Sequence, residues 1–105
     1  TMNYLPVLKR INKLMTAKGY SLTSVGDGEE VLRASDALNI TALYNWATQC
    51  EQGSMHYRDT SGNSISYYLI YGSEHSDTIA DTGYNTLQAE QDADEVTEDI
   101  YKLYQ

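Results

Sequence analysis

The strongest constraint on the fold lies between residues 55 and 71, where two strand-like segments are joined by residues that favour turns. The segments are Met55–Arg58 and Ile65–Tyr71, and Asp59, Thr60, Ser61, Gly62, Asn63 and Ser64 stand between them. Two strands joined by so short a connection pair in antiparallel fashion. The second strand has apolar residues on both faces, with Tyr67 and Leu69 on one and Tyr68 on the other. This pattern predicts an interior position in a sheet.

Three other segments carry apolar residues at the spacing of an amphipathic helix. The first begins near Asn3, a candidate N-cap, and ends at Gly19, and the second begins at Ser35 or Asp36 and ends at Gly53. The three apolar stripes are Leu5, Leu8, Ile11, Leu14 and Met15; Ala37, Ile40, Leu43, Ala47 and Cys50, with Trp46 beside them; and Ala89, Ala93, Val96, Ile100 and Leu103. Each stripe should face the core, so Cys50 is expected to be buried and unreactive.

The remaining strand signals complete an α+β pattern. Tyr20–Val25 and Glu29–Arg33 flank a glycine-containing turn, and Thr78–Thr82 is a candidate edge strand. The order α-β-β-α-β-β-(β)-α lacks the alternation that parallel βαβ units require. We therefore predict a single domain over residues 1–105, with an antiparallel sheet of four to five strands and three helices packed mainly on one face. The opposite face should carry part of the tyrosine set.

Charge is distributed very unevenly along the chain. Residues 1–58 hold five acidic and six basic residues, whereas residues 59–105 hold ten acidic residues against Lys102 alone. Phosphate contacts need Lys and Arg, so the second half argues against direct binding to nucleic acid. It favours a basic protein surface as the partner, although the acids could also serve solubility alone.

The chain contains ten tyrosines and one tryptophan but no phenylalanine. Tyrosine packs its ring while keeping a polar tip near water, so it suits half-buried surfaces and interfaces. We therefore expect much of the aromatic content to lie at the margin of the core.

Metal and catalytic templates fit the sequence poorly. Asp59, Ser61 and Asn63 match the first ligand positions of a calcium loop, but Ile70 stands where the bidentate glutamate is required, so an Asx-type turn is favoured. Two histidines and one cysteine at irregular spacing do not predict a zinc site. The loop around His75 contains Ser76 and Asp77, but side chains of one loop seldom converge into a triad. We expect no metal, no cofactor and no enzymatic activity.

The single cysteine and the absence of an apolar leader predict a cytoplasmic protein. No apolar run approaches the roughly 18 to 20 residues of a membrane span, so no membrane association is expected. The oligomeric state is left open.

The stretch GYSLTSVGDGEE at residues 19–30, followed by a helical segment and by YYLIYG at residues 67–72, resembles small accessory proteins encoded by phages and prophages. The resemblance covers about a fifth of the chain and includes no catalytic motif. It implies a host-directed or regulatory role in bacteria, with the bacterial host cytoplasm as the expected location, and it favours an inhibitor or a partner-binding protein.

Two hypotheses about function remain. The first is an acidic, tyrosine-rich protein that occupies a basic surface of a partner, such as a nucleic-acid-binding surface, as an inhibitor or an anti-defence or immunity-type protein. Its expected partner-binding residues are Glu90, Asp94, Glu95, Glu98, Asp99, Tyr68 and Tyr101. The second is a binding protein for a nucleotide-like or planar anionic small molecule, or a small enzyme, with a pocket between the tyrosine-bearing strands and a helix. Its expected pocket residues are His56, Arg58, Tyr67 and Tyr71.

Overall fold

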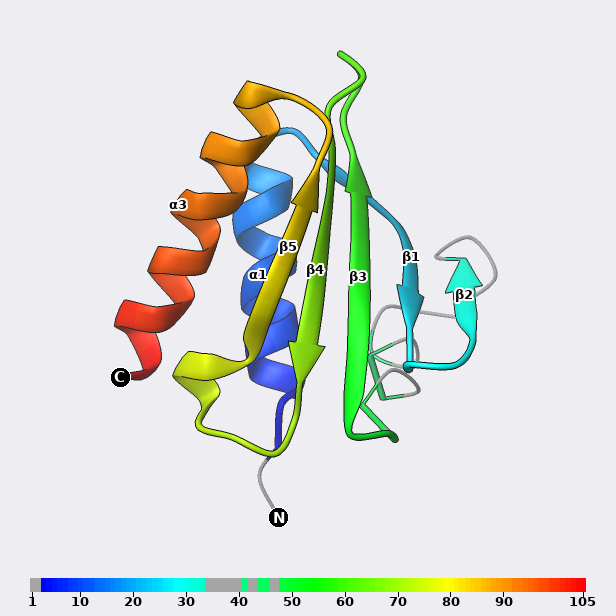
Figure 1. The fold of residues 1–105 in the computed structure, drawn as a ribbon, viewed down its shortest axis with the longest axis vertical. Coiled ribbons are helices and arrows are strands. Elements are labelled where there is room, and N and C mark those ends of the chain that lie inside the picture. The colour runs from blue at the N-terminus through cyan, green and yellow to red at the C-terminus, as the bar shows by residue number, and fades with distance from the viewer. Residues whose placement is uncertain (1–2, 34–40, 42–43, 46–47) are drawn as a thin grey trace.

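The computed structural model describes residues 3–33, 41, 44–45 and 48–105 of the chain. The described residues form two α-helices, a short 3-10 helix and one five-stranded sheet (Figure 1). The elements are α1 (Leu5–Ala17), β1 (Ser21–Gly26), β2 (Val31–Arg33), β3 (Gln52–Arg58), β4 (Ser64–Ile70), η2 (His75–Asp77), β5 (Ile79–Tyr84) and α3 (Leu87–Tyr104). The strand order is β2-β1-β3-β4-β5, and every neighbouring pair is antiparallel. The predicted α+β class and antiparallel sheet are confirmed.

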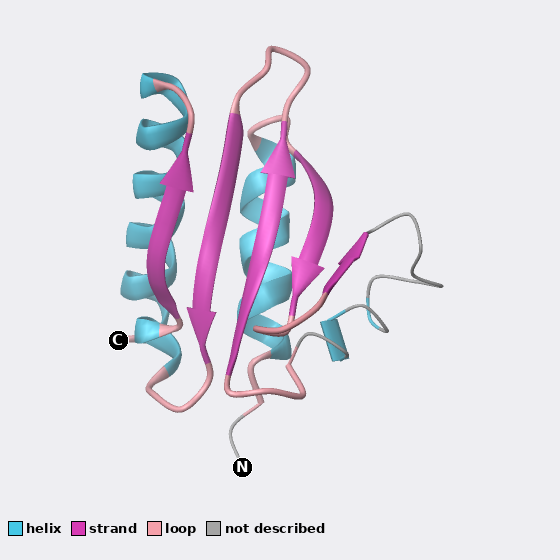
Figure 2. Ribbon diagram, turned by 45° about the vertical axis from the view of Figure 1, so that its right-hand side comes forward, coloured by secondary structure: helices cyan, strands magenta, loops and turns pink. Residues whose placement is uncertain are grey.

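Both helices pack on the same face of the sheet (Figure 2). The core between these layers is built from buried side chains of α1, α3 and the three strands β1, β3 and β4. They include Val7, Leu8, Ile11 and Met15 of α1, Ala89, Ala93, Val96 and Ile100 of α3, and Val25, Met55, Tyr57, Ile65, Tyr67 and Leu69 of the sheet. The predicted apolar stripes of the first and last helices thus face the core, except that Leu103 is exposed. No helix of the described residues covers the opposite face, which we call the open face.

The helix expected between residues 35 and 50 falls largely outside the described residues, as do Ala37, Ile40, Leu43, Trp46 and Ala47 on it. Its expected C-terminal end is described and differs from the prediction. Cys50 is exposed in the bend before β3, so the prediction that it is buried was wrong. Gly53 lies within β3 and does not end a helix.

The reason for a glycine at position 53 is close packing. A Cβ atom there would lie 2.8 Å from the carbonyl oxygen of Gly26 and would meet the hydroxyl of Tyr71. Hydrogen alone fits between these groups. The same residue therefore signals a strand interior here rather than a helix stop.

In the turn between β3 and β4, the residues that partly match a calcium loop stabilise the turn by hydrogen bonds. The carboxylate of Asp59 accepts hydrogen bonds from the backbone N–H groups of Ser61 and Asn63 at 3.0 and 2.8 Å, and from the Asn63 amide at 2.8 Å. These bonds, led by the one from the Asn63 side chain, hold the pKa of Asp59 below its ordinary value. The predicted Asx-type turn is present.

The tyrosines are divided between the core and the surface. Tyr4, Tyr20, Tyr44, Tyr57 and Tyr67 are buried, which is half of the ten. The other five are exposed or half-buried, so the expected position at the margin of the core holds for half of the tyrosines. The hydroxyls of three of the buried tyrosines reach partners at the edge of the core: Tyr4 donates to the Ser73 carbonyl, Tyr20 to Asp92 and Tyr57 to Asn12. Tyrosine can therefore replace phenylalanine at these positions.

Candidate functional site

The acidic residues of α3 lie on two different sides of the helix. Asp94 and Glu98 line a groove beside β5, and Glu90 accepts a hydrogen bond from the Tyr84 hydroxyl of β5 at 2.5 Å. Glu95 instead contacts Lys18, which follows the C-terminal end of α1. Asp99 follows Glu95 by four residues and shares its side of the helix. The sequence treated these five acids as one set, but the fold separates them.

The acids beside β5 differ in how strongly they are neutralised. Glu98 pairs with Lys102 at 2.8 Å, and this hydrogen bond lowers the pKa of Glu98 and raises that of Lys102. The bond to Glu90 raises the pKa of Tyr84, because the phenol donates to a carboxylate that would repel its ionised form. Asp94 forms no ion pair within the described part of the chain. A net negative charge therefore remains on this side of α3.

The groove between α3 and β5, which we call the α3–β5 groove, has a volume of about 680 Å³. It contains three carboxylates beside a mainly apolar floor. The described residues that line it are Ile70, Ser76, Asp77, Ile79, Ala80, Asp94, Thr97, Glu98 and Tyr101. None of them is Lys or Arg. A cation with an apolar body would find both charge and contact area in this groove.

The two tyrosines expected to be binding anchors are both accessible in the free protein. Tyr101 is 49 % exposed and lines the α3–β5 groove, while Tyr68 is 46 % exposed on the open face. Exposed aromatic rings can be buried by a partner with a small loss of side-chain entropy. Their positions on different surfaces mean that one flat contact with α3 would not cover both.

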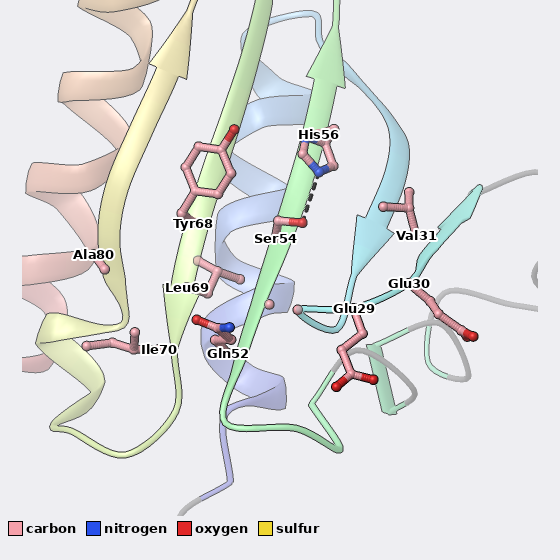
Figure 3. A pocket seen from close by; sticks show the side chains of 12 residues that line it. Glu29, Glu30, Val31, Gln52, Ser54, His56, Tyr68, Leu69, Ile70 and Ala80 are labelled. Atoms are coloured by element: carbon pink, nitrogen blue, oxygen red, sulfur yellow. Dashed lines mark hydrogen bonds between the residues drawn. The ribbon is translucent and has the colours of Figure 1, made fainter.

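A second groove, which we call the open-face groove, crosses the sheet beside Tyr68 (Figure 3). Its volume is about 440 Å³, and the β1–β2 turn, β3, β4 and β5 all contribute to it. The lining residues are Gly28, Glu29, Glu30, Val31, Gln52, Gly53, Ser54, His56, Tyr68, Leu69, Ile70 and Ala80. Two carboxylates lie at its rim, and Lys and Arg do not occur among these described lining residues.

His56 is held in place by two serines beneath the open-face groove. Its Nδ1 lies 2.8 Å from Ser66 Oγ, and its Nε2 lies 2.9 Å from Ser54 Oγ. Burial lowers the pKa of His56, so the ring is neutral at neutral pH. A neutral imidazole has one donor and one acceptor nitrogen, so one serine accepts from the ring and the other donates to it.

This arrangement provides hydrogen-bonding groups but little that would drive catalysis. Among the described residues, no carboxylate is hydrogen-bonded to His56 to orient it as a base. Strand β3 is paired on both sides, by β1 and β4, so its backbone N–H groups are used in the ladder and do not converge on a developing oxyanion. The groove is better suited to binding than to covalent chemistry.

The structure does not bring the four expected pocket residues together. His56 lies on the open face, whereas Tyr67 is buried on the helix face, where its hydroxyl donates to Met15 Sδ at 3.0 Å. Tyr71 packs beside the Tyr4 ring, with a centroid separation of 5.2 Å. Arg58 is exposed at the opposite end of β3 from Gln52. A planar anion would therefore find no cation among the described residues that line the groove with His56.

Sequence reasoning missed several residues that line the two grooves: Glu29, Glu30, Val31, Ile70, Asp77 and Ile79. One signal was available, because Ile70 shares a face with Tyr68 at a two-residue interval, and Tyr68 was already a candidate anchor. The others come from separate elements. Their proximity depends on the strand order, which the sequence pattern did not fix.

No protein-family model, curated protein or solved structure matches this chain. The described residues contain no group of three or more His, Cys, Asp or Glu side chains placed to hold a metal ion. Within that same part of the chain, no helix is both long and apolar enough to cross a bilayer.

Proposed function

We propose that this chain is a binding protein that docks its acidic, partly apolar α3–β5 groove onto a basic surface of a partner protein. The observation that carries the proposal is the composition of this groove. Asp77, Asp94 and Glu98 stand beside exposed Tyr101, and the described lining residues include no base. Desolvated apolar contacts supply affinity, and the carboxylates supply attraction and orientation.

The basic surface that fits this groove best is one that otherwise holds nucleic acid. Such surfaces carry several Lys or Arg residues placed to contact phosphates. Carboxylates at four-residue intervals on a helix present negative charge along a line, and a tyrosine beside them offers an aromatic anchor. The chain would then act as an inhibitor by excluding nucleic acid. This role agrees with the host-directed, inhibitory role that the phage resemblance favours.

Two charge-matched double variants test the site. Asp94→Asn/Glu98→Gln removes two carboxylates on the β5 side of α3, and Glu95→Gln/Asp99→Asn removes two on the α1 side. The wild-type chain and both variants would be used as bait in a bacterial lysate at low salt. A protein captured through the groove should be lost with the first variant and retained with the second.

The captured protein is then purified and its binding to nucleic acid is measured with and without this chain. We expect the chain to displace nucleic acid, and the Asp94→Asn/Glu98→Gln variant to do so at least about tenfold less effectively. Equal loss of capture with both double variants would show that only net charge matters. Simultaneous binding of nucleic acid and this chain would rule out the inhibitory role.

A further inference from the structure

We infer that the α3–β5 groove and the open-face groove form one continuous docking surface. The occupant is an extended segment of the partner with apolar side chains at its centre and Lys or Arg at both ends. This inference rests on the proposed function and adds two things to it: the sheet's open face takes part, and the partner must present an apolar centre.

The two grooves are joined by shared residues. Ile70 at the end of β4 and Ala80 near the start of β5 line both of them. In Figure 3, these two residues lie at the end of the open-face groove nearest β5, and Glu29 and Glu30 lie at the other end. A chain leaving the α3–β5 groove over Ala80 therefore enters the open-face groove directly.

The middle of this joint surface is apolar and accessible. Tyr68, Ile70 and Tyr101 are all exposed, and Ile70 belongs neither to the buried core nor to the residues packed against it. An exposed isoleucine between two exposed tyrosines has the composition of an interface centre, where apolar contacts exclude water. This arrangement calls for apolar side chains at the centre of the partner segment.

Both ends of the surface carry negative charge. Asp94 and Glu98 mark the α3 end, and Glu29 and Glu30 mark the end at the β1–β2 turn. The described lining residues of both grooves contain no Lys or Arg, and of these four carboxylates Glu98 is paired with a lysine, Lys102. Because His56 is neutral at neutral pH, it does not repel a cation either. Charge complementarity therefore places basic side chains at both ends of the occupant.

Docking through side chains fits this surface better than the addition of a strand to the free edge of β5. The carboxylate of Asp81 accepts the backbone N–H of Thr82 at 2.8 Å. This N–H is therefore not free to pair with an incoming strand, and an acidic residue on an edge strand discourages strand pairing in general. The partner segment is expected to cross the end of β5 rather than extend the sheet.

Two synthetic peptides of about ten residues test the inference, since an extended chain of that length spans roughly 33 Å. Both carry two arginines at each end. One has a leucine- and tryptophan-containing centre, and the other has a glycine–serine centre of equal length and charge. Affinities are measured by isothermal titration calorimetry, and the contacted residues are mapped by amide chemical-shift changes.

We expect the apolar-centred peptide to bind at least about tenfold more tightly, because it alone buries Ile70 and the two tyrosines. Its shift changes should include residues of both grooves, whereas those of the glycine–serine peptide should be centred on α3. Equal affinities would overturn the inference and leave the proposed function standing. Failure of both peptides to bind at low salt would overturn both.

Substitutions in the protein separate the centre from the ends. Ile70→Ser should lower the affinity for the apolar-centred peptide about tenfold and leave the affinity for the glycine–serine peptide nearly unchanged. Leu87→Ser is the matched control, because Leu87 is also exposed but lines neither groove. An equal effect of the two substitutions would contradict the assigned centre.

Glu29→Gln/Glu30→Gln tests the end at the β1–β2 turn. It should lower the affinity for the apolar-centred peptide and reduce the chemical-shift changes that this peptide causes at the open face. Both effects should be larger than those of Glu95→Gln/Asp99→Asn, although each variant removes two charges. If the Glu95→Gln/Asp99→Asn variant has the larger effect, the occupant does not reach the β1–β2 turn.

Discussion

At the scale of single residues, the buried tyrosines connect the two layers of the fold. The Tyr57 hydroxyl donates to Asn12 Oδ1 of α1 at 3.0 Å, and the Tyr20 hydroxyl donates to Asp92 Oδ2 of α3 at 2.7 Å. Desolvation raises the pKa of both phenols, so they stay protonated and act as donors throughout the physiological range. Tyrosine therefore fills the core as phenylalanine would and also fixes the helices against the sheet.

Gly53 offers a sharp test of packing at one residue. Gly53→Ala should destabilise the protein by about 1–3 kcal/mol, because the added Cβ would meet the Gly26 carbonyl and the Tyr71 hydroxyl within a paired strand. Gly72→Ala is the control, since a Cβ there meets nothing within 4 Å and should change the free energy of unfolding by less than about 0.5 kcal/mol. Urea unfolding of both variants measures the difference. Equal stability would refute the close approach at Gly53.

His56 should make stability depend on pH in a defined direction. Its pKa in the folded protein lies below the ordinary value of 6.5, so the unfolded chain binds the proton more readily. The contribution of His56 to the free energy of unfolding is fully present at pH values above its pKa in the unfolded chain. It is lost as the pH falls from there through its pKa in the folded protein.

Replacing His56 with glutamine retains hydrogen-bonding capacity toward Ser54 and Ser66 but removes the titration. The stability of His56→Gln should therefore fall less than that of the wild type when pH is lowered from neutral to mildly acidic values. Urea unfolding across this pH range makes the comparison, and an NMR titration of the imidazole gives the pKa directly. Parallel pH profiles for the two proteins, or a folded pKa above 6.5, would contradict the assignment.

At the scale of elements, the helix ends depend on side chains that the apolar pattern did not reveal. Thr86 is the N-cap of α3: its hydroxyl oxygen accepts the Ala89 N–H at 3.0 Å and its hydroxyl donates to Asn63 Oδ1 at 2.6 Å. At the other helix, Tyr4 is the N-cap residue, although Asn3 accepts the N–H of Leu5 at 3.0 Å. Thr86 therefore links the start of α3 to the turn between β3 and β4.

Thr86→Ala should lower the free energy of unfolding by about 1 kcal/mol, because it leaves the Ala89 N–H without its partner. Thr97→Ala is a suitable control within the same helix. Its hydroxyl donates to the Ala93 carbonyl one turn earlier, and alanine is the better helix former. Chemical denaturation of both should show a loss for Thr86→Ala and little change or a gain for Thr97→Ala. A larger loss at Thr97 would argue against the capping role.

The elements with a clear periodicity were predictable from sequence, and those at boundaries were not. The three-and-four spacing from Leu5 to Met15 and from Ala89 to Ile100 predicted both described α-helices, and the apolar residues on both faces of β4 predicted its interior position in the sheet. The candidate edge strand was expected to end at Thr82, but β5 continues through Gly83 to Tyr84. A glycine in the sequence is compatible both with a turn and with a close-packed strand. Only tertiary contacts distinguish these two uses.

At the scale of the whole molecule, the acidic second half of the chain was visible in the sequence, but the binding surface was not. The sequence grouped Glu95 and Asp99 with Asp94 and Glu98, because all four follow one another on a single helix. Packing of α1 beside α3 places Glu95 against Lys18, whereas β5 and η2 turn the other side of α3 into a groove. The surroundings of each side of α3 thus depend on the pairing of β4 with β5 and on the packing of the helices against the sheet.

The segregation of charge predicts how association should respond to salt. For the apolar-centred peptide, the association rate constant should fall markedly between about 50 and 500 mM salt, as the Debye length shrinks from roughly 14 to 4 Å. The dissociation rate constant should change less, because it depends on contacts that are already desolvated. Asp94→Asn/Glu98→Gln should reproduce part of the salt effect on association at low salt. Stopped-flow or surface-plasmon kinetics measure both rate constants.

Truncation of an exposed aromatic anchor should have the opposite kinetic signature. Tyr101→Ala removes apolar contact area without changing charge, so it should raise the dissociation rate constant several-fold and leave association nearly unaffected. The acid-to-amide variants and the tyrosine variant thus separate attraction at a distance from contact at the surface. If the association rate is indifferent both to salt and to the loss of Asp94 and Glu98, the carboxylates of α3 have no part in capture. The acidity of the chain would then serve solubility alone.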